Sequence, residues 1–233
     1  VDATTYEQGN MHLAPEKATK VDLSYNFSSQ AVNLFVNGYL SHTTDYISQM
    51  TKMDNERLIT TYANADSDIK TGVEVSLKVT PAKWMNFSVG ANTYYVTTEG
   101  VFEGMHIDNQ GWTNNSNLLL DFVPWKGGDL QLQYFITTPQ YYPQLTTSLT
   151  HQMNMGIKQR FMKGAMTASI LVTDVLNTAK WDVWSNNSLF NLKNSSTNKS
   201  RMIWLGFSYN FNSFKQKSNQ KAETDRSLIK LGL

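Results

Sequence analysis

The chain has 233 residues, and its 20 Lys and Arg residues nearly balance 19 Asp and Glu residues, which gives a formal net charge of +1. This balance argues against nucleic-acid binding, which favours a clearly basic surface. The absence of Cys excludes structural disulfides and thiolate metal sites. No run of 18 apolar residues is present to form a membrane-spanning helix. The chain starts at Val1 without an initiator Met or signal peptide, so we expect a mature or excised part of a longer protein.

Apolar and polar residues alternate along most of the chain. Val21, Leu23, Tyr25 and Phe27, for example, are each separated by one polar residue. A period of two is typical of β-strands, and no long helix is predicted before residue 212, so the predicted fold class is all-β. In chain order, the nine or so predicted strands cover about 20–27, 32–40, 72–79, 86–92, 118–122, 130–136, 153–157, 166–172 and 201–211.

The predicted connections alternate strictly between short turns and long polar segments. Short turns are predicted at 28–30, 80–83, 123–128 and 161–164, and long segments at 41–60, 97–111, 137–144 and 174–200. Outer-membrane β-barrels combine short periplasmic turns with long extracellular loops. A β-sandwich lacks this regular alternation. The pattern therefore indicates an antiparallel, up-and-down transmembrane β-barrel segment.

The two faces of the predicted strands differ in a way that fits lipid on one side. The apolar face carries no Asp, Glu, Lys or Arg, and an Arg or Lys there would cost about 2–4 kcal/mol at the bilayer midplane. The other face is mostly Asn, Gln, Ser, Thr and Gly, as suits a polar lumen. Alternation alone is equally expected of a soluble β-sandwich or solenoid with one face on a core, and this alternative stays open.

Four aromatic residues lie at strand ends beside short turns: Trp84, Trp125, Tyr209 and Phe211. Aromatic residues gather at both membrane–water interfaces of barrels. We therefore predict that these four form an interfacial girdle; packing over a soluble core is the alternative.

Five short motifs, in order, resemble those of TonB-dependent outer-membrane transporters. Residues 9–17 (Gly-Asn-Met-His-Leu-Ala-Pro-Glu-Lys) resemble a segment that precedes a late barrel strand. Residues 72–77 (Gly-Val-Glu-Val-Ser-Leu) and 81–84 (Pro-Ala-Lys-Trp) resemble a strand and turn further along. Residues 174–178 (Asp-Val-Leu-Asn-Thr) are similar to the motif ahead of the last hairpin, and 209–211 (Tyr-Asn-Phe) to the terminal aromatic signal. The charged tail that follows the last predicted strand makes the chain similar to Bacteroidetes members of the family.

The resemblance implies that residues 1–211 are the C-terminal portion of a larger barrel, of 22 strands, in a Gram-negative outer membrane. It also implies partners: outer-membrane lipid, the remaining strands and plug of the same protein, the TonB complex reached through an N-terminal region, and a surface lipoprotein. No nucleic-acid partner is expected. Residues 212–233 carry five Lys or Arg against two carboxylates, and we expect a polar, solvated periplasmic tail there.

Catalysis finds no support in the sequence. No nucleophile elbow, phosphate-binding loop, dinucleotide fingerprint or zinc-protease motif is present. We predict no catalytic residue, no cofactor and no metal site, because His12, His42, His106 and His151 are scattered without ligand spacing. The carboxylates predicted to face the lumen, Asp22, Glu74 and Asp121, are expected to form hydrogen bonds.

Aromatic residues in or beside the predicted external loops are the candidate ligand-binding residues. They are Tyr141, Tyr142, Trp112, Trp181 and Trp184, with the first two favoured because Pro139 and Pro143 stiffen their loop. The predicted function is TonB-dependent uptake of a nutrient, a glycan, peptide or metal chelate. Two alternatives stay open: a soluble carbohydrate-binding or enzymatic β-domain, and a non-transporting barrel that acts as a structural or assembly partner.

Overall fold

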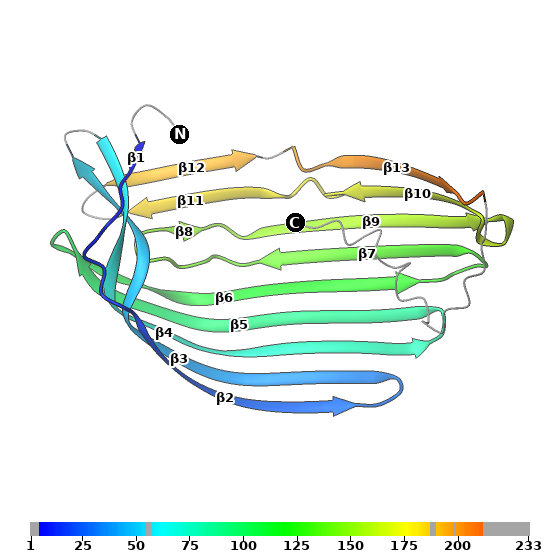
Figure 1. The fold of residues 1–233 in the computed structure, drawn as a ribbon, viewed down its shortest axis with the longest axis horizontal. Coiled ribbons are helices and arrows are strands. Elements are labelled where there is room, and N and C mark those ends of the chain that lie inside the picture. Colours follow the sequence, from blue (N-terminus) through cyan, green and yellow to red (C-terminus); the bar gives the residue numbers. More distant parts are fainter. Residues whose placement is uncertain (1–4, 55–56, 187–189, 198, 212–233) are drawn as a thin grey trace.

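The fold is built on one antiparallel meander of long strands (Figure 1). The computed structural model describes residues 5–54, 57–186, 190–197 and 199–211; the predicted tail at 212–233 lies outside them. Nine strands follow one another across the sheet in chain order, which confirms the predicted nine-strand arrangement. They are β2 (Lys17–Ser28), β3 (Val32–Asp54), β4 (Arg57–Ala82), β5 (Met85–Phe102), β6 (Met105–Phe122), β7 (Gly128–Thr137), β9 (Thr150–Phe161), β10 (Met166–Thr173) and β13 (Met202–Tyr209).

Four short strands lie outside this meander. β1 (Thr5–Glu7) pairs parallel with β4 at Leu58–Thr60. A second, three-stranded sheet joins β8 (Thr146–Thr147), β11 (Lys180–Asn186) and β12 (Asn191–Thr197). The η1 helix (Met162–Gly164) is a single turn between β9 and β10. The predicted long segment at 174–200 therefore contains strands of its own.

All four predicted short turns lie at one end of the sheet, on the right in Figure 1. Between β2 and β3, the amide of Ser29 donates to the carbonyl of Val32 at 2.7 Å. Between β6 and β7, Gly127 takes the left-handed conformation at φ 79°, which only glycine adopts without cost. The short turns thus define one end of the molecule, here called the short-turn end.

At the opposite end, two predicted loops are strand instead. The predicted loop at 41–60 is taken up by β3, which continues to Asp54, and by β4, which begins at Arg57. The predicted loop at 97–111 is the continuation of β5 and β6, joined by Glu103 and Gly104 at φ 51° and 76°. Positive φ at both residues is the tight hairpin turn that suits twisted strands. The prediction was wrong because both faces of these extensions are polar enough to hide the period of two.

The register of the strands places apolar residues beside apolar residues on one face of the sheet and polar residues beside polar residues on the other. Val36, Val75 and Ala91 are direct neighbours on three adjacent strands, and one residue further along Asn37 pairs with Glu74. Side chains of successive strand residues point to opposite faces. The sheet therefore has an apolar face, which carries the Val and Leu positions, and a polar face, which carries Asn37 and Glu74.

The ends of the long strands fold into a small apolar core. Ala65 and Asp68 on β4 are both buried, although regular alternation would place them on opposite faces, so the pattern shifts between them. Opposite this point Asp45 adopts φ 53°, and β4 pairs with β5 only from Ser67 onward. The β3–β4 hairpin consequently packs against the β5–β6 hairpin. The buried cluster contains Met50, Ala63, Ala65, Phe102, Met105 and Ile107.

We expect Met50→Ala to loosen the β3–β4 hairpin. Met50 is fully buried in this cluster, and truncating such a side chain to Ala costs about 2–5 kcal/mol because a cavity remains. Hydrogen exchange of the amides in 46–52 should become faster, while exchange in the strands near the short-turn end stays unchanged. Met53→Ala is the matched control, because Met53 is 53% exposed. Equal exchange in the two variants would contradict this role of the cluster.

Candidate functional site

The apolar face of the sheet is an extended exposed surface. Leu23 is 82% exposed, Leu205 79% and Phe207 71%, and further exposed Leu, Val and Ile side chains lie on the strands between these two edge strands. Soluble monomers rarely expose a contiguous apolar surface larger than a few hundred Å². This face is therefore made to contact something apolar.

Aromatic side chains border this face at the short-turn end. Trp84 packs against Phe122 with ring centroids 5.6 Å apart, and Tyr209 contacts Phe211 edge to face at 4.6 Å. The ring of Trp125 covers Gly128, where a side chain would collide with it, and its Nε1 donates to Gln159 Oε1 at 2.5 Å. The four residues predicted to form a girdle lie together at this border of the sheet.

A second aromatic pair, which we call the second aromatic band, lies on the same face about ten residues further along β5 and β6. Tyr95 and Trp112 meet edge to face at 5.5 Å. Tyr134, whose Oη lies 3.1 Å from His151 Nδ1, pairs with Leu118 and therefore lies between this pair and the short-turn border. Eleven residues separate Trp84 from Tyr95, which is about 37 Å along a strand and about 26–30 Å along the axis of a barrel with strands tilted at 35–45°. The stretch of this face between Trp84 and Tyr95 thus matches the height expected for lipid contact. Val89 and Leu118 lie within it, and Thr93 and Asn114, which bond to each other at 2.6 Å, lie at its upper end.

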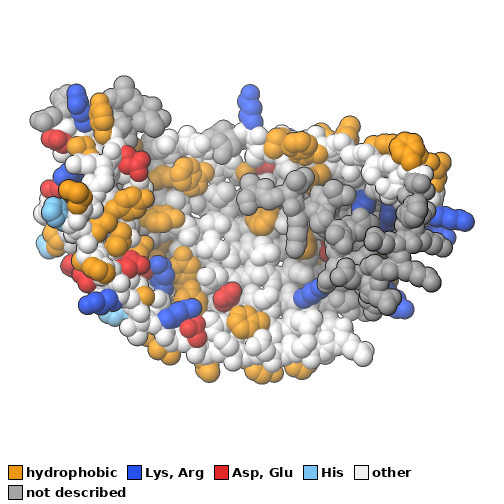
Figure 2. All heavy atoms as spheres, viewed as in Figure 1, with side chains coloured by type: hydrophobic (Ala, Val, Ile, Leu, Met, Phe, Trp, Pro, Cys, Tyr) orange, Lys and Arg blue, Asp and Glu red, His pale blue; other side chains and the backbone are white. Residues whose placement is uncertain are grey.

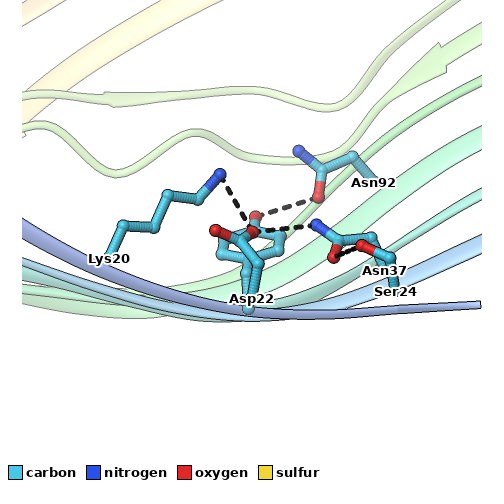
Figure 3. A network of polar contacts seen from close by, with 6 residues as sticks. Lys20, Asp22, Ser24, Asn37 and Asn92 are labelled. Carbon is cyan, nitrogen blue, oxygen red and sulfur yellow. Dashed lines mark hydrogen bonds and ion pairs between the residues drawn. The ribbon is translucent and has the colours of Figure 1, made fainter.

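The polar face carries hydrogen-bonded side chains at the same level (Figure 3). Asp22 accepts from Asn37 Nδ2 at 3.0 Å and from Lys20 Nζ at 3.1 Å, while Ser24 donates to Asn37 Oδ1 at 2.7 Å. Asn92, on β5, accepts from the hydroxyl of Tyr39 at 2.9 Å. Figure 2 shows little hydrophobic colour in the middle of this face, as suits a surface that meets water or polar protein. Of the predicted lumen carboxylates, Asp22 and Asp121 accept side-chain hydrogen bonds, Asp121 from Gln131.

At the end opposite the short turns, the loop between β7 and β9 folds across the polar face. Gln144 is buried. Its side-chain Oε1 accepts from the backbone N–H of Thr51 at 2.6 Å, and its Nε2 donates to the backbone carbonyl of Thr51 at 3.1 Å. This pair of bonds imitates a strand neighbour on the edge of β3. Thr113 Oγ1 donates to the Pro139 carbonyl at 3.0 Å, so the loop is fixed to β3 and β6. We call this end, with its folded loop and hairpins, the mouth.

A cleft of about 560 Å³ opens at the mouth. One wall is the β5–β6 hairpin end at 104–109. The other is formed by Pro143, Gln144 and Thr146 together with Trp184 and Ser185 of β11. Asn109 ties the walls together, because its Nδ2 donates to the Tyr142 carbonyl at 2.6 Å. Its volume lies in the range of small-ligand sites.

The five predicted loop aromatics occupy different surroundings. Only Trp184 lines the cleft; Trp181, on the same strand, is offset by an odd number of residues and lies on the other side of β11. The ring of Tyr141 lies against Gly111, and Tyr142, next to the cleft, is 48% exposed. Trp112 lies within β6, in the second aromatic band, and not in a loop.

Gln144, Asn109 and Ser185 are cleft or loop-anchoring residues that the sequence did not suggest. Single Gln, Asn and Ser residues in polar segments are too common to stand out. No three His, Asp or Glu residues come together as a candidate metal site in the part of the chain that the structure describes.

Asp174 organises the turn that follows β10. It is buried, has φ 46°, and its carboxylate accepts from the amides of Thr178 at 2.9 Å and Ala179 at 3.2 Å and from the hydroxyl of Ser200. Burial alone would raise the pKa of this carboxyl, but these hydrogen bonds and the positive charge of Arg201 outweigh it and lower the pKa below 3.8. The motif at 174–178 thus anchors the extended segment that carries β11 and β12.

These features define a membrane β-sheet with a lipid-facing side, a polar side and a ligand-sized cleft at one end. Residues 1–209 match the outer membrane protein beta-barrel family. The chain belongs to this family, and the membership decides against the soluble alternative. A comparison with curated proteins finds no matching relative.

Among the described residues, no helix is long and apolar enough to span a bilayer. In outer-membrane barrels the short turns generally face the periplasm and the long loops face outward.

We expect Val75→Arg to impair folding into a bilayer, while Ser76→Arg is tolerated. The two residues are adjacent in the part of β4 that pairs with β5, on the apolar and the polar face respectively. A charge facing lipid at the midplane costs about 2–4 kcal/mol, whereas one on the other face stays in polar surroundings. The measurement is urea-dependent folding of the complete protein into lipid vesicles, followed by the heat-modifiable shift in gel mobility. Equal folding midpoints for the two variants would contradict the assignment of the faces.

Asp174→Asn is expected to lower the urea midpoint at pH 7 but not in strong acid. A carboxyl whose pKa is lowered in the folded protein stabilises the fold above its unfolded pKa, and this contribution is lost as the pH falls through the folded value. The difference from the native protein should therefore shrink below about pH 4. Asp108→Asn, at an exposed carboxylate, serves as the control and should show no such difference. A midpoint difference that persists at low pH would point to packing instead.

Proposed function

We propose that this chain forms part of the wall and extracellular mouth of a TonB-dependent outer-membrane transporter or receptor for a nutrient. The mouth captures the ligand, the polar face lines its route, and the energy comes from an inner-membrane complex that acts on a plug. No side chain of this chain performs chemistry in this function. The observation that carries the proposal is the cleft at the mouth, above a wide polar face.

The width of the sheet supports a barrel larger than these nine strands. Within the described residues the sheet stays open, with β2 at one edge and β13 at the other. Each unpaired backbone group in hydrocarbon costs several kcal/mol, so both edges need strand partners in the membrane. We propose that these partners are further strands of the same barrel, which would then be wide enough to hold a plug.

The fixed loop and hairpins at the mouth support capture over free diffusion. A pore for small solutes needs an open mouth, whereas here the β7–β9 loop is bonded to β3 and β6 across the polar face. A ligand that settles in the cleft would need a driven change to move inward. This favours energised transport through a plugged barrel, and a surface lipoprotein that covers the mouth would be a compatible partner.

The test is nutrient uptake by cells that carry or lack the gene, each with the TonB system intact or deleted. Peptide mixtures, oligosaccharides and chelated iron are supplied in turn as labelled nutrients. We expect uptake of at least one of them to require both this protein and TonB. Uptake that needs the protein but not TonB would indicate a passive pore. If uptake of every nutrient is independent of the protein, it would instead be a structural or assembly barrel, and the proposal would be wrong.

A further inference from the structure

We propose that the cleft at the mouth binds an extended peptide, which adds as a strand to the free edge of β6. This inference rests on the proposed function and names the ligand class of its capture site. The reason is the backbone of β6, which along the cleft wall has a strand partner on one side only among the residues that the structure describes. β6 pairs with β5 from Met105 onward but with β7 only from Asn115.

The direction of the free backbone groups follows from the hairpin. Phe102 and Met105 close the two-residue turn, so they form a hydrogen-bonded pair and odd-numbered residues of β6 bond to β5. At the far end, the amide and carbonyl of Asn114 bond to Thr138 instead, on the other side of β6. Even-numbered residues therefore direct their backbone groups away from β5. At the cleft these are His106 and Asp108.

The free edge is accessible and rigid. Met105 and Ile107, on either side of His106, are buried in the apolar core of the mouth, and this holds the strand straight. Across the cleft, Trp184 is 39% exposed and Ser185 is buried. A peptide strand laid along His106 and Asp108 can exchange up to four backbone hydrogen bonds, and one of its side chains can pack on the Trp184 ring. Main-chain bonds to an open edge with a side-chain pocket opposite are a recurring mode of peptide recognition.

The charge of the lining argues for a neutral or basic peptide. Asp108 is the only Asp, Glu, Lys or Arg among the described residues that line the cleft. Anionic ligands, such as carboxylate or catecholate metal chelates, would find no Lys or Arg there to pair with. A row of alternating donors and acceptors at strand spacing suits a polypeptide backbone better than a sugar ring.

The first experiment selects binders from a random heptapeptide library on the complete protein in lipid nanodiscs. The best binder is then resynthesised with a single backbone N-methyl group at each position in turn. Strand addition predicts that N-methylation weakens binding at every second residue only, about tenfold or more per site. Binding that tolerates N-methylation everywhere, or a library that yields no binder, would overturn the proposal.

A second experiment alters the edge of β6 itself. Asp108→Pro removes the backbone donor that faces the cleft but leaves the bonds from β6 to β5 intact, as proline permits at strand edges. We expect Asp108→Pro to abolish binding of the selected peptide, Trp184→Ala to weaken it about tenfold, and Asp108→Asn to retain most of it. Equal loss in Asp108→Asn and Asp108→Pro would show that the carboxylate, not the edge, binds the peptide.

These outcomes separate the inference from the proposed function. If uptake requires this protein and TonB for oligosaccharides or chelated iron but not for peptides, the transport function holds and the peptide site is wrong. If peptides bind with the alternating N-methyl pattern but no uptake depends on TonB, the site holds and the transport function is wrong.

Discussion

The structure depends on one constraint, which is that backbone amides and carbonyls in a bilayer must be paired by neighbouring strands. The meander satisfies it by joining each strand to the next along its length, from β2 to β13. Once the backbone is satisfied in this way, side chains on the apolar face are free to meet lipid, and Leu23 and Leu205 need no protein cover. The exposed apolar side chains, which would be a liability in a soluble protein, are therefore a consequence of how the backbone is paired.

The same strands follow a second rule once they leave the bilayer. Near Ser67 the alternation on β4 shifts, and β4 exchanges β5 for β1 as its neighbour. Beyond this point water surrounds both faces, so burial of apolar side chains again stabilises the fold. Met50 and Ile107 become core residues there, while Val75, on the same long hairpin and within the apolar band, stays on the lipid-facing side. One continuous hairpin thus works as a membrane wall at one end and as part of a folded layer outside the bilayer at the other.

The membrane part could be predicted from the sequence because lipid imposes a strict period of two. In β4 the period of two is clear, because polar residues separate Val73, Val75, Leu77 and Val79. The short turns were predicted from residues such as Pro81 and Gly127. The mouth could not be predicted in the same way. Its strands carry apolar residues too sparsely for the period of two to stand out, and its key contact joins Gln144 to the backbone of Thr51, 93 residues away. Trp184 was found as an aromatic residue near a loop, but its place in the cleft depends on the pairing of β11 with β8, which no local pattern encodes.

The free edge of β6 shows why the mouth can carry a specific function while the wall stays generic. An unpaired edge inside the bilayer costs several kcal/mol for each backbone group, so natural barrels close it there. In water the same groups are solvated, and an open edge is tolerated when it is short or covered. At the mouth, the β7–β9 loop turns inward at Thr138, so within the described residues His106 and Asp108 have β5 as a strand neighbour on one side and no strand on the other. The change of solvent along a single strand, from hydrocarbon to water, is therefore what permits a recognition edge at this position and forbids one further down.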